Sequence, residues 1–328
     1  MIDLIKIMEE KARIKPAKIV ICEGWDERCL RATDNILKNK LANIVLLGNP
    51  ADIKNKAKEL NLDIKNAEIV DFKNDKKLKK ELAEKLVEVR KHKGMTIEEA
   101  NKLIEDENYF GCMYAYCKYA DAVAGSAICP TAALMKPALQ ILREKDKLVS
   151  ETAFMGDVKN KRKLIISDTS LNISPTAQEL AQVGLNAIDS ARMFDISPRV
   201  AFVSYSTKGS GGNGPDLMLI REAVKITQEK DKKAIVDGEM QIDAAVNPKS
   251  AQKKCPDSIL KGDANILIFP NLMSSNLFVH GIGQFSDMTF DFTVLKGLIK
   301  PVAILGRSMP VEGIRNMIVG CAMQVNSK

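Results

Sequence analysis

The sequence is poor in aromatic residues and in histidine. Phe, Tyr and Trp make up 5% of the 328 residues, with a single tryptophan, and the only histidines are His92 and His280. Proteins that bind single-stranded nucleic acid stack bases on aromatic rings, so this scarcity argues against a nucleic-acid partner. Neither histidine stands in a pattern typical of a catalytic triad.

Signals for metals, disulfides and membranes are also missing. The seven cysteines are scattered, without a CxxC pair or a zinc-type spacing to the histidines. We therefore expect neither a structural metal nor disulfides. No apolar run approaches the length of a membrane span, and residues 1–13 form an amphipathic helical pattern rather than a signal peptide. These absences predict a cytoplasmic protein with no membrane partner.

What the sequence does have is an ordinary globular composition and an excess of positive charge. Hydrophobic residues make up 45% and charged residues 28% of a chain long enough for two domains. The net charge of +7 comes mostly from dispersed lysines. We expect these to be solvated, with a mildly positive field that helps to draw in small polyanions.

Helical and strand patterns alternate along the chain with short links, which is typical of parallel α/β sheets. The predicted strands are 18–22, 43–47, 68–71, 120–124, 148–154, 163–167, 200–205, 234–236, 265–270 and 302–305. The predicted helices include 26–39, 51–60, 76–91, 97–105, 131–142 and 175–194. Thr96 and Glu99 form a capping-box signature for one helix, and Pro137 should kink another or lie near its start.

A glycine-rich segment, RVAFVSYSTKGSGGNGPD at 199–216, has the composition of an anion site. It reads as a strand, a loop and a helix start, a junction that offers uncovered backbone N–H groups and a partial positive charge. Its candidate donors are Ser206, Thr207, Lys208, Gly209 and Ser210. The segment matches neither of the two nucleotide-binding fingerprints, G-x-x-x-x-G-K-[ST] and G-x-G-x-x-G. A phosphate-binding loop and a mobile surface loop without ligand are therefore both compatible with the segment.

Six segments, in matching order and nearly end to end, resemble the phosphate acetyltransferases, or phosphotransacetylases. They are VRKHKG (89–94), NYFG (108–111), KPALQI (136–141), SYSTKGS (204–210), DGEMQIDAAV (237–246) and GDANILIFPNL (262–272). The resemblance implies two doubly wound α/β domains of the isocitrate/isopropylmalate dehydrogenase type, usually in a homodimer, with the active site in the interdomain cleft. It places the tail with the first domain, so we expect domain 1 at 1–145 plus 296–328 and domain 2 at 146–295.

The implied activity interconverts acetyl-CoA and phosphate with CoA and acetyl phosphate, by direct transfer in a ternary complex. CoA and acetyl-CoA are then substrates, and no cofactor or metal is permanently bound. Arg307, after the predicted strand 302–305, falls at the arginine that binds the reacting groups in the family. Arg28 and Arg90 lie in family-like segments and are assigned to phosphate or CoA, as are the five loop donors. Lys136 replaces a cleft arginine, which keeps the charge but loses bidentate geometry.

Several positions depart from the family pattern. The serine before the reactive arginine is Gly306, and a second family position, an aspartate, is Ala133. The aspartate that acts as base toward the CoA thiol falls at Gly313. Glu312 is the adjacent candidate, although one helical position is a rotation of roughly 100°. Cys129 stands at a family histidine and is interpreted as a small buried or half-buried residue.

These departures leave three interpretations of the function. The first is a phosphate acetyltransferase. The second is a catalytically weakened paralogue that binds CoA or acyl phosphate as a sensor or partner subunit, and the third is a phosphotransacylase for a longer acyl chain. Asp237, Glu239 and Asp243, placed beyond the strand 234–236, could bind a metal, but the resemblance implies a structural role for them.

Overall fold

The computed structural model describes residues 3–157 and 162–327. The chain divides into two compact units, each a mixture of helices and strands. One comprises residues 2–147 together with 298–328 and is called the terminal unit here; the other comprises residues 148–297 and is called the central unit. The sequence between the predicted strands 148–154 and 163–167 is typical of a polar turn at 156–162, and most of that segment, 158–161, lies outside the described residues.

The terminal unit is built on five parallel strands. In spatial order they are β11 (Val302–Ile304), β4 (Ala122–Gly125), β1 (Lys18–Ile21), β2 (Asn43–Leu47) and β3 (Glu68–Val70). Val20, at the centre, pairs with Val45 on one side and Val123 on the other. All three valines are completely buried. Short apolar runs of this kind are expected where helices cover both faces of a parallel sheet.

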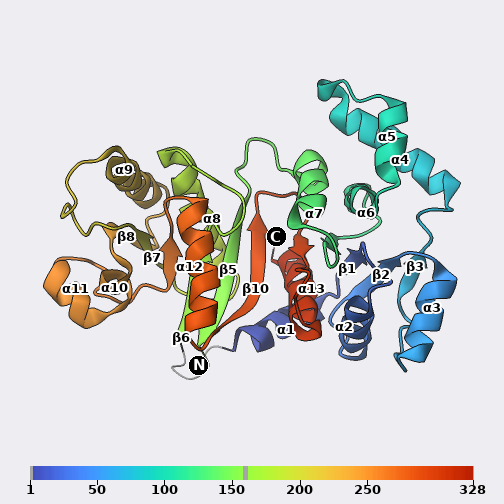
Figure 1. Ribbon diagram of the computed structural model, residues 1–328, viewed down its shortest axis with the longest axis horizontal. Helices are drawn as coiled ribbons and strands as arrows, with labels where there is room; N and C mark the ends of the chain where they lie inside the picture. Colours follow the sequence, from blue (N-terminus) through green and yellow to red (C-terminus); the bar gives the residue numbers. More distant parts are fainter. Residues whose placement is uncertain (1–2, 158–161, 328) are drawn as a thin grey trace. The chain divides into compact units, whose positions relative to one another are not determined.

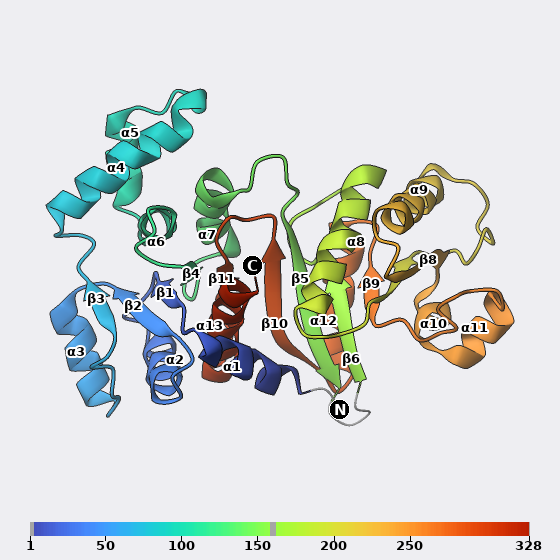
Figure 2. The ribbon, with the colours of Figure 1, turned by 180° about the vertical axis from the view of Figure 1, so that it is seen from behind.

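Helices flank this sheet on both sides (Figures 1 and 2). On one side lie α1 (Leu4–Ile14), α2 (Glu27–Lys38), α3 (Pro50–Glu59) and α13 (Val311–Asn326). On the other lie α4 (Lys76–Arg90), α5 (Ile97–Ile104), α6 (Glu107–Tyr116) and α7 (Thr131–Pro137). The capping box predicted at Thr96 and Glu99 is present at the start of α5. The α-helical hydrogen bonding of α7 ends at Pro137, and a π-helical segment, Ala138–Leu142, continues the chain.

The central unit has a mixed six-stranded sheet. Its spatial order is β10 (Met288–Lys296), β5 (Ser150–Asp157), β6 (Arg162–Ser167), β9 (Ile266–Ile268), β7 (Arg199–Val203) and β8 (Ile235–Met240). The pairs β10–β5 and β5–β6 are antiparallel, and the other three pairs are parallel. The helices α8 (Ala177–Arg192) and α12 (Leu272–Phe285) lie on opposite faces of this sheet (Figures 1 and 2). Three more helices complete the unit: α9 (Pro215–Lys230), α10 (Ile242–Val246) and α11 (Pro248–Lys254).

Three features of the central unit differ from the sequence-based expectations. The strand β10 was not predicted, because its pairing with β5, rather than a local turn signal, defines it. The segment NLMSSN (271–276) follows the predicted strand 265–270 and its sequence predicts a loop, but it begins α12, with Asn271 as the N-cap. The strand β8 continues to Met240, so Asp237 and Glu239 lie within it and not beyond it. Asp and Gly disfavour strands locally, but pairing with β7 overrides that preference.

Candidate active site

The carboxyl ends of β1, β4 and β11 meet at one edge of the terminal unit's sheet, because these strands are parallel neighbours. Crevices at such edges are where open α/β sheets bind ligands. Three segments emerge there: Cys22 and Glu23 after β1, the loop 126–130 after β4, and the loop 305–310 after β11. We call the loops at 126–130 and 305–310 the β4 loop and the β11 loop.

Arg28, on α2, ties the β4 and β11 loops together. Its Nη1 donates to the carbonyl oxygens of Arg307 and Met309 at 2.7 and 3.3 Å, and its Nη2 donates to that of Ala127 at 2.7 Å. Its Nε and Nη2 also bond the two carboxylate oxygens of Asp26, each at 3.1 Å. These five contacts equal the five N–H donors of a guanidinium. In this structure all five N–H groups of Arg28 are engaged within the protein, and its contact with phosphate or CoA stays a prediction.

Arg307 is held by its backbone and leaves its side chain available. The carbonyl oxygen accepts the bond from Arg28, and the residue is exposed. Within residues 3–157 and 162–327, no hydrogen bond or ion pair engages its guanidinium. A pinned backbone with an unpaired cation at the carboxyl edge of a sheet is suited to bind an anion.

At the two candidate positions for the base on α13, 312 and 313, no described residue holds a carboxylate toward this edge of the sheet. Glu312 is exposed in the first turn of α13, where the helix dipole favours a carboxylate whatever its function. A Cβ at Gly313 would lie 2.6 Å from Cγ of Met309. Met309 therefore fills the space into which a side chain at 313 would project.

Two further predicted cations belong to the same unit. Arg90 is the last residue of α4, and its Nε is buried without a hydrogen-bond partner among the described residues. Burial and Asp106 raise the pKa of Tyr109, and the positive charge of Arg90 works against that rise. Lys136, near the end of α7, is exposed. Within residues 3–157 and 162–327, neither residue forms a hydrogen bond or ion pair with Arg307.

A buried polar cluster at this edge was missed by the sequence reasoning. Glu23 is completely buried, and its Oε1 accepts a hydrogen bond from Sγ of Cys129 at 3.4 Å. The Sγ atom also lies 3.5 Å from Oγ of Ser126 and 3.9 Å from Nδ2 of Asn108. Burial raises the pKa of both Glu23 and Cys129. The available signal was a glutamate placed directly after a strand of a parallel sheet.

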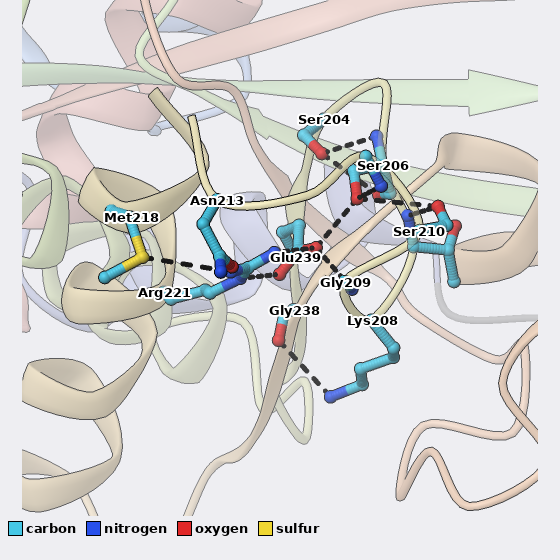
Figure 3. Close-up of polar contacts among 12 residues, drawn as sticks. Ser204, Ser206, Lys208, Gly209, Ser210, Asn213, Met218, Arg221, Gly238 and Glu239 are labelled. Atoms are coloured by element: carbon cyan, nitrogen blue, oxygen red, sulfur yellow. Dashed lines mark hydrogen bonds and ion pairs between the residues drawn. The ribbon is translucent and has the colours of Figure 1, made fainter. Parts of the chain in front are cut away.

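The glycine-rich loop lies in the central unit and closes around a carboxylate of the protein itself (Figure 3). Oε1 of Glu239 accepts the Gly209 N–H and the Ser206 hydroxyl, both at 2.9 Å. The guanidinium of Arg221 pairs with both oxygens, at 2.8 and 3.1 Å. Glu239 is only 1% exposed. The Gly209 N–H and the Ser206 hydroxyl thus already have an acceptor within the protein.

The other backbone N–H groups at 206–212 are also engaged. Their acceptors are Oγ of Ser204 for Ser206, Oγ of Ser210 for Thr207, the Glu239 carbonyl for Lys208, the Thr207 carbonyl for Ser210, Oγ of Ser206 for Gly211 and the Gly209 carbonyl for Gly212. The ammonium of Lys208 pairs with Asp237. The expectation that the N–H groups at 206–212 are uncovered is therefore wrong. The physical reason is the continuation of β8, which places Glu239 against the loop.

The acidic residues of this region are paired with cations. Asp237 contacts Lys208 and the Ser258 hydroxyl, and Asp243 pairs with Lys254 at 2.9 Å. Among residues 3–157 and 162–327, no group of three or more His, Cys, Asp and Glu side chains is placed to hold a metal ion. In the same part of the chain, no helix is long and apolar enough to cross a membrane.

The Glu239 network predicts a loss of stability in acid. Burial tends to raise the pKa of Glu239, but the bonds from Arg221, Gly209 and Ser206 outweigh it and lower that pKa to about 2. A depressed carboxyl pKa adds stability that is complete above its unfolded value and is lost as the pH falls through the folded value. We expect the melting temperature to fall from about pH 5 to about pH 2. Thermal unfolding of the Glu239→Gln variant should follow a flatter pH profile in that window, and an unchanged profile would contradict the assignment.

The fold and this edge define an α/β protein in which an arginine, unpaired among the described residues, lies where parallel strands end. A protein of this class is suited to anionic ligands. Residues 3–322 match the family model described as phosphate acetyl/butaryl transferase. The chain is 38% identical to the phosphate acetyltransferase of Bacillus subtilis, over 99% of both chains. It superposes on the phosphotransacetylase EutD of Staphylococcus aureus with a TM-score of 0.88 at 35% identity, and on a phosphotransacetylase of Streptococcus pyogenes with 0.90 at 34%, covering 98% of each chain in both cases.

The chain belongs to the phosphate acetyl/butaryl transferase family. The resemblance read from six short segments is thereby confirmed. The mixed α/β fold with parallel strands and two units agrees with the phosphotransacetylase structures.

Proposed function

We propose that this chain is a phosphate acetyltransferase, which interconverts acetyl-CoA and phosphate with CoA and acetyl phosphate by direct transfer in a ternary complex. Relatives that match this chain over nearly their whole length bear that name. The observation in this structure that carries the proposal is Arg307, whose backbone is pinned at the sheet edge while its guanidinium remains unpaired among the described residues. Acyl transfer to and from phosphate needs such a cation for the charge that develops in the transition state.

The other predicted residues receive roles that follow from their contacts. Arg28 positions the β4 and β11 loops through their carbonyl oxygens. Arg90 and Lys136 supply positive charge for phosphate or CoA. The Nε atom of Arg90 is buried without a hydrogen-bond partner among the described residues, so it can donate to a ligand. Glu312 remains a candidate to receive the thiol proton, from the first turn of α13.

In the glycine-rich loop, the buried residues have a structural role and the exposed residues contact the ligand. Ser206 and Thr207 are buried and, with Gly209, hold the loop on Glu239 and Gln241. Lys208 and Ser210 are exposed, so contact with phosphate or CoA falls to them. In this proposal the loop is preformed by its own carboxylate and does not wait for a ligand to order it.

We further propose a cytoplasmic homodimer that uses CoA and acetyl-CoA as substrates and holds no permanent cofactor. The outer face of α12 supports self-association. Met273, Leu277 and Phe285 on this helix are 75%, 68% and 92% exposed. An apolar face of this kind is typical of a surface that another protein covers.

The function is tested by a thiol-release assay on the purified chain with acetyl-CoA and phosphate, beside a series of longer acyl-CoAs. We expect turnover with acetyl-CoA and a kcat/KM that falls with each added methylene, by a factor of about ten or more. Intersecting double-reciprocal lines are expected for a ternary complex. A maximum at butyryl or longer would favour a phosphotransacylase for longer chains. Saturable CoA binding without turnover would favour the weakened paralogue.

A further inference from the structure

We propose that Cys129 and Glu23 together accept the proton of the CoA thiol, Cys129 in contact with the substrate and Glu23 as the final acceptor. The inference rests on the function proposed above, because only a thiol-transfer reaction needs such a base. It assigns a task to Glu23, which the family resemblance did not identify, and to Cys129, which stands at a family histidine, and it makes the carboxylate missing at position 313 unnecessary.

The need for another acceptor comes from α13. Gly313 has no side chain, and the contact of 2.6 Å between a Cβ there and Met309 shows that the space is filled. Glu312 is exposed, and no described residue fixes its carboxylate toward the β11 loop. A general base must lie within hydrogen-bond reach of the proton that it removes, directly or through one intermediary.

Glu23 has the environment of a proton acceptor rather than of a structural carboxylate. It is completely buried, yet no lysine or arginine pairs with it among the described residues, and its Oε2 has no hydrogen-bond partner there. Oδ1 of Asn108, in the same cluster, is also buried without a partner. Buried polar atoms in native proteins are nearly always satisfied. An unsatisfied oxygen on a buried carboxylate whose other oxygen lies 3.4 Å from a thiol therefore marks a place where a donor enters.

Cys129 connects this carboxylate to the outside. Glu23 is inaccessible to solvent, whereas Cys129 is partly exposed and its Sγ lies 3.4 Å from Oε1 of Glu23. A thiol both donates and accepts a hydrogen bond, so it can pass a proton on without a change in its own net charge. Burial raises the pKa of Cys129, which keeps the thiol protonated and able to donate to Glu23. Burial also raises the pKa of Glu23, which makes its carboxylate a stronger base.

The same guanidinium fixes Cys129 and Arg307 relative to each other. Arg28 donates 2.7 Å bonds to the carbonyls of Ala127, two residues before Cys129, and of Arg307. The proton acceptor and the proposed anion-binding arginine thus stand on two loops that meet at one side chain. A substrate held by Arg307 would have its reacting thiol beside the β4 loop.

In the direction that consumes CoA, the proposed step balances as follows. The CoA thiol gives its proton to Sγ of Cys129, while Cys129 gives its own proton to Oε1 of Glu23. The CoA sulfur forms a bond to the carbonyl carbon of acetyl phosphate, and the bond from that carbon to the phosphate oxygen breaks. Phosphate leaves with the electron pair. In the reverse direction Glu23 returns a proton through Cys129 to the departing CoA sulfur.

The test measures kcat and the KM for CoA, with acetyl phosphate saturating, in four variants of the full chain. We expect Glu23→Gln and Cys129→Ala to lower kcat about a hundredfold, the contribution of a positioned general base, with KM changed less than about threefold. Cys129→Ser should recover about tenfold of the loss seen in Cys129→Ala, because a hydroxyl can also accept and donate. The control Cys117→Ala, a partly exposed cysteine at the end of α6, should keep wild-type kcat.

A readout of the proton itself separates a relay from a packing role. The wild-type rate measured in mixtures of H2O and D2O should curve as expected for two protons in flight, and Cys129→Ala should not retain that curvature. Wild-type kcat in Glu23→Gln or in Cys129→Ala would overturn the proposal, as would a loss in Cys129→Ser equal to that in Cys129→Ala. Because Cys129 is partly exposed, its two variants remain informative if Glu23→Gln fails to fold. A wild-type chain without turnover overturns the proposed function as well, whereas normal turnover in the variants overturns the relay alone.

Discussion

Replacement of Arg307 by alanine is expected to lower kcat for acetyl transfer about a thousandfold, the upper range for removal of one group that stabilises transition-state charge. The guanidinium lies at the carboxyl edge of the terminal unit's sheet and has no competing partner among the described residues. Its charge is therefore available to a substrate without the cost of breaking an ion pair. The measurement is a thiol-release assay with acetyl-CoA and phosphate, run at several concentrations of each.

Two further variants serve as controls. One tests whether the positive charge alone is enough at position 307, and the other tests whether the loss of any arginine lowers kcat. Arg307→Lys should fall between wild type and Arg307→Ala, because a lysine keeps the charge but not the bidentate geometry. Arg13→Ala removes an arginine on α1 that pairs with Glu9 at 2.9 Å, and it should keep wild-type kcat. The thermal unfolding of Arg307→Ala should match the wild type, since the side chain is exposed. Full activity in Arg307→Ala would remove the central observation behind the proposed function.

Replacement of Glu239 by alanine should have the largest effect on stability. Its carboxylate holds Arg221, the Ser206 hydroxyl and the Gly209 N–H, and all of these lose their acceptor together. Removing one partner of a buried pair costs 3–5 kcal/mol in general, and Arg221 is 27% exposed and can regain water, so we expect a loss of about 3 kcal/mol. The measurement is the free energy of unfolding in urea.

Asp243→Ala is the matched control for Glu239→Ala. Asp243 also pairs with a cation, Lys254, but the two side chains are 48% and 39% exposed. Solvent screening limits such a pair to at most about 1 kcal/mol. Equal losses in the two variants would show that Glu239 contributes no more than a surface ion pair, and that the loop at 204–214 does not depend on it.

Much of the fold follows from local patterns. The strand at 43–47 was predicted with its exact bounds, and the capping box before α5 was predicted from two residues. These elements are local, since alternating apolar and polar patterns and caps act over a few residues. The strand β10 was not predicted, because only its pairing with β5, more than a hundred residues earlier, makes its sequence a strand.

For the candidate site, too, short motifs predicted some features and only the tertiary structure showed others. Motifs of a few residues were enough to single out Arg307 and the glycine-rich loop, and to recognise the family that the full-length comparisons confirm. What each donor bonds could not be predicted from those motifs. Arg28, for which contact with phosphate or CoA is expected, bonds two loops of the protein in this structure. The N–H group of Gly209, expected to be uncovered, is bonded to Glu239.

The sequence by itself thus determined the class of fold, the family and the segments from which the site is built, because these depend on periodicity and on short motifs that are contiguous in the chain. Only the tertiary structure decided which polar groups are already satisfied and which remain open to a ligand. Glu23 and Cys129 are separated by 106 positions and lie on different strand ends, and they meet because β1 and β4 are neighbours in the sheet. Hydrogen-bond partnership depends on that proximity in space, which no local pattern encodes.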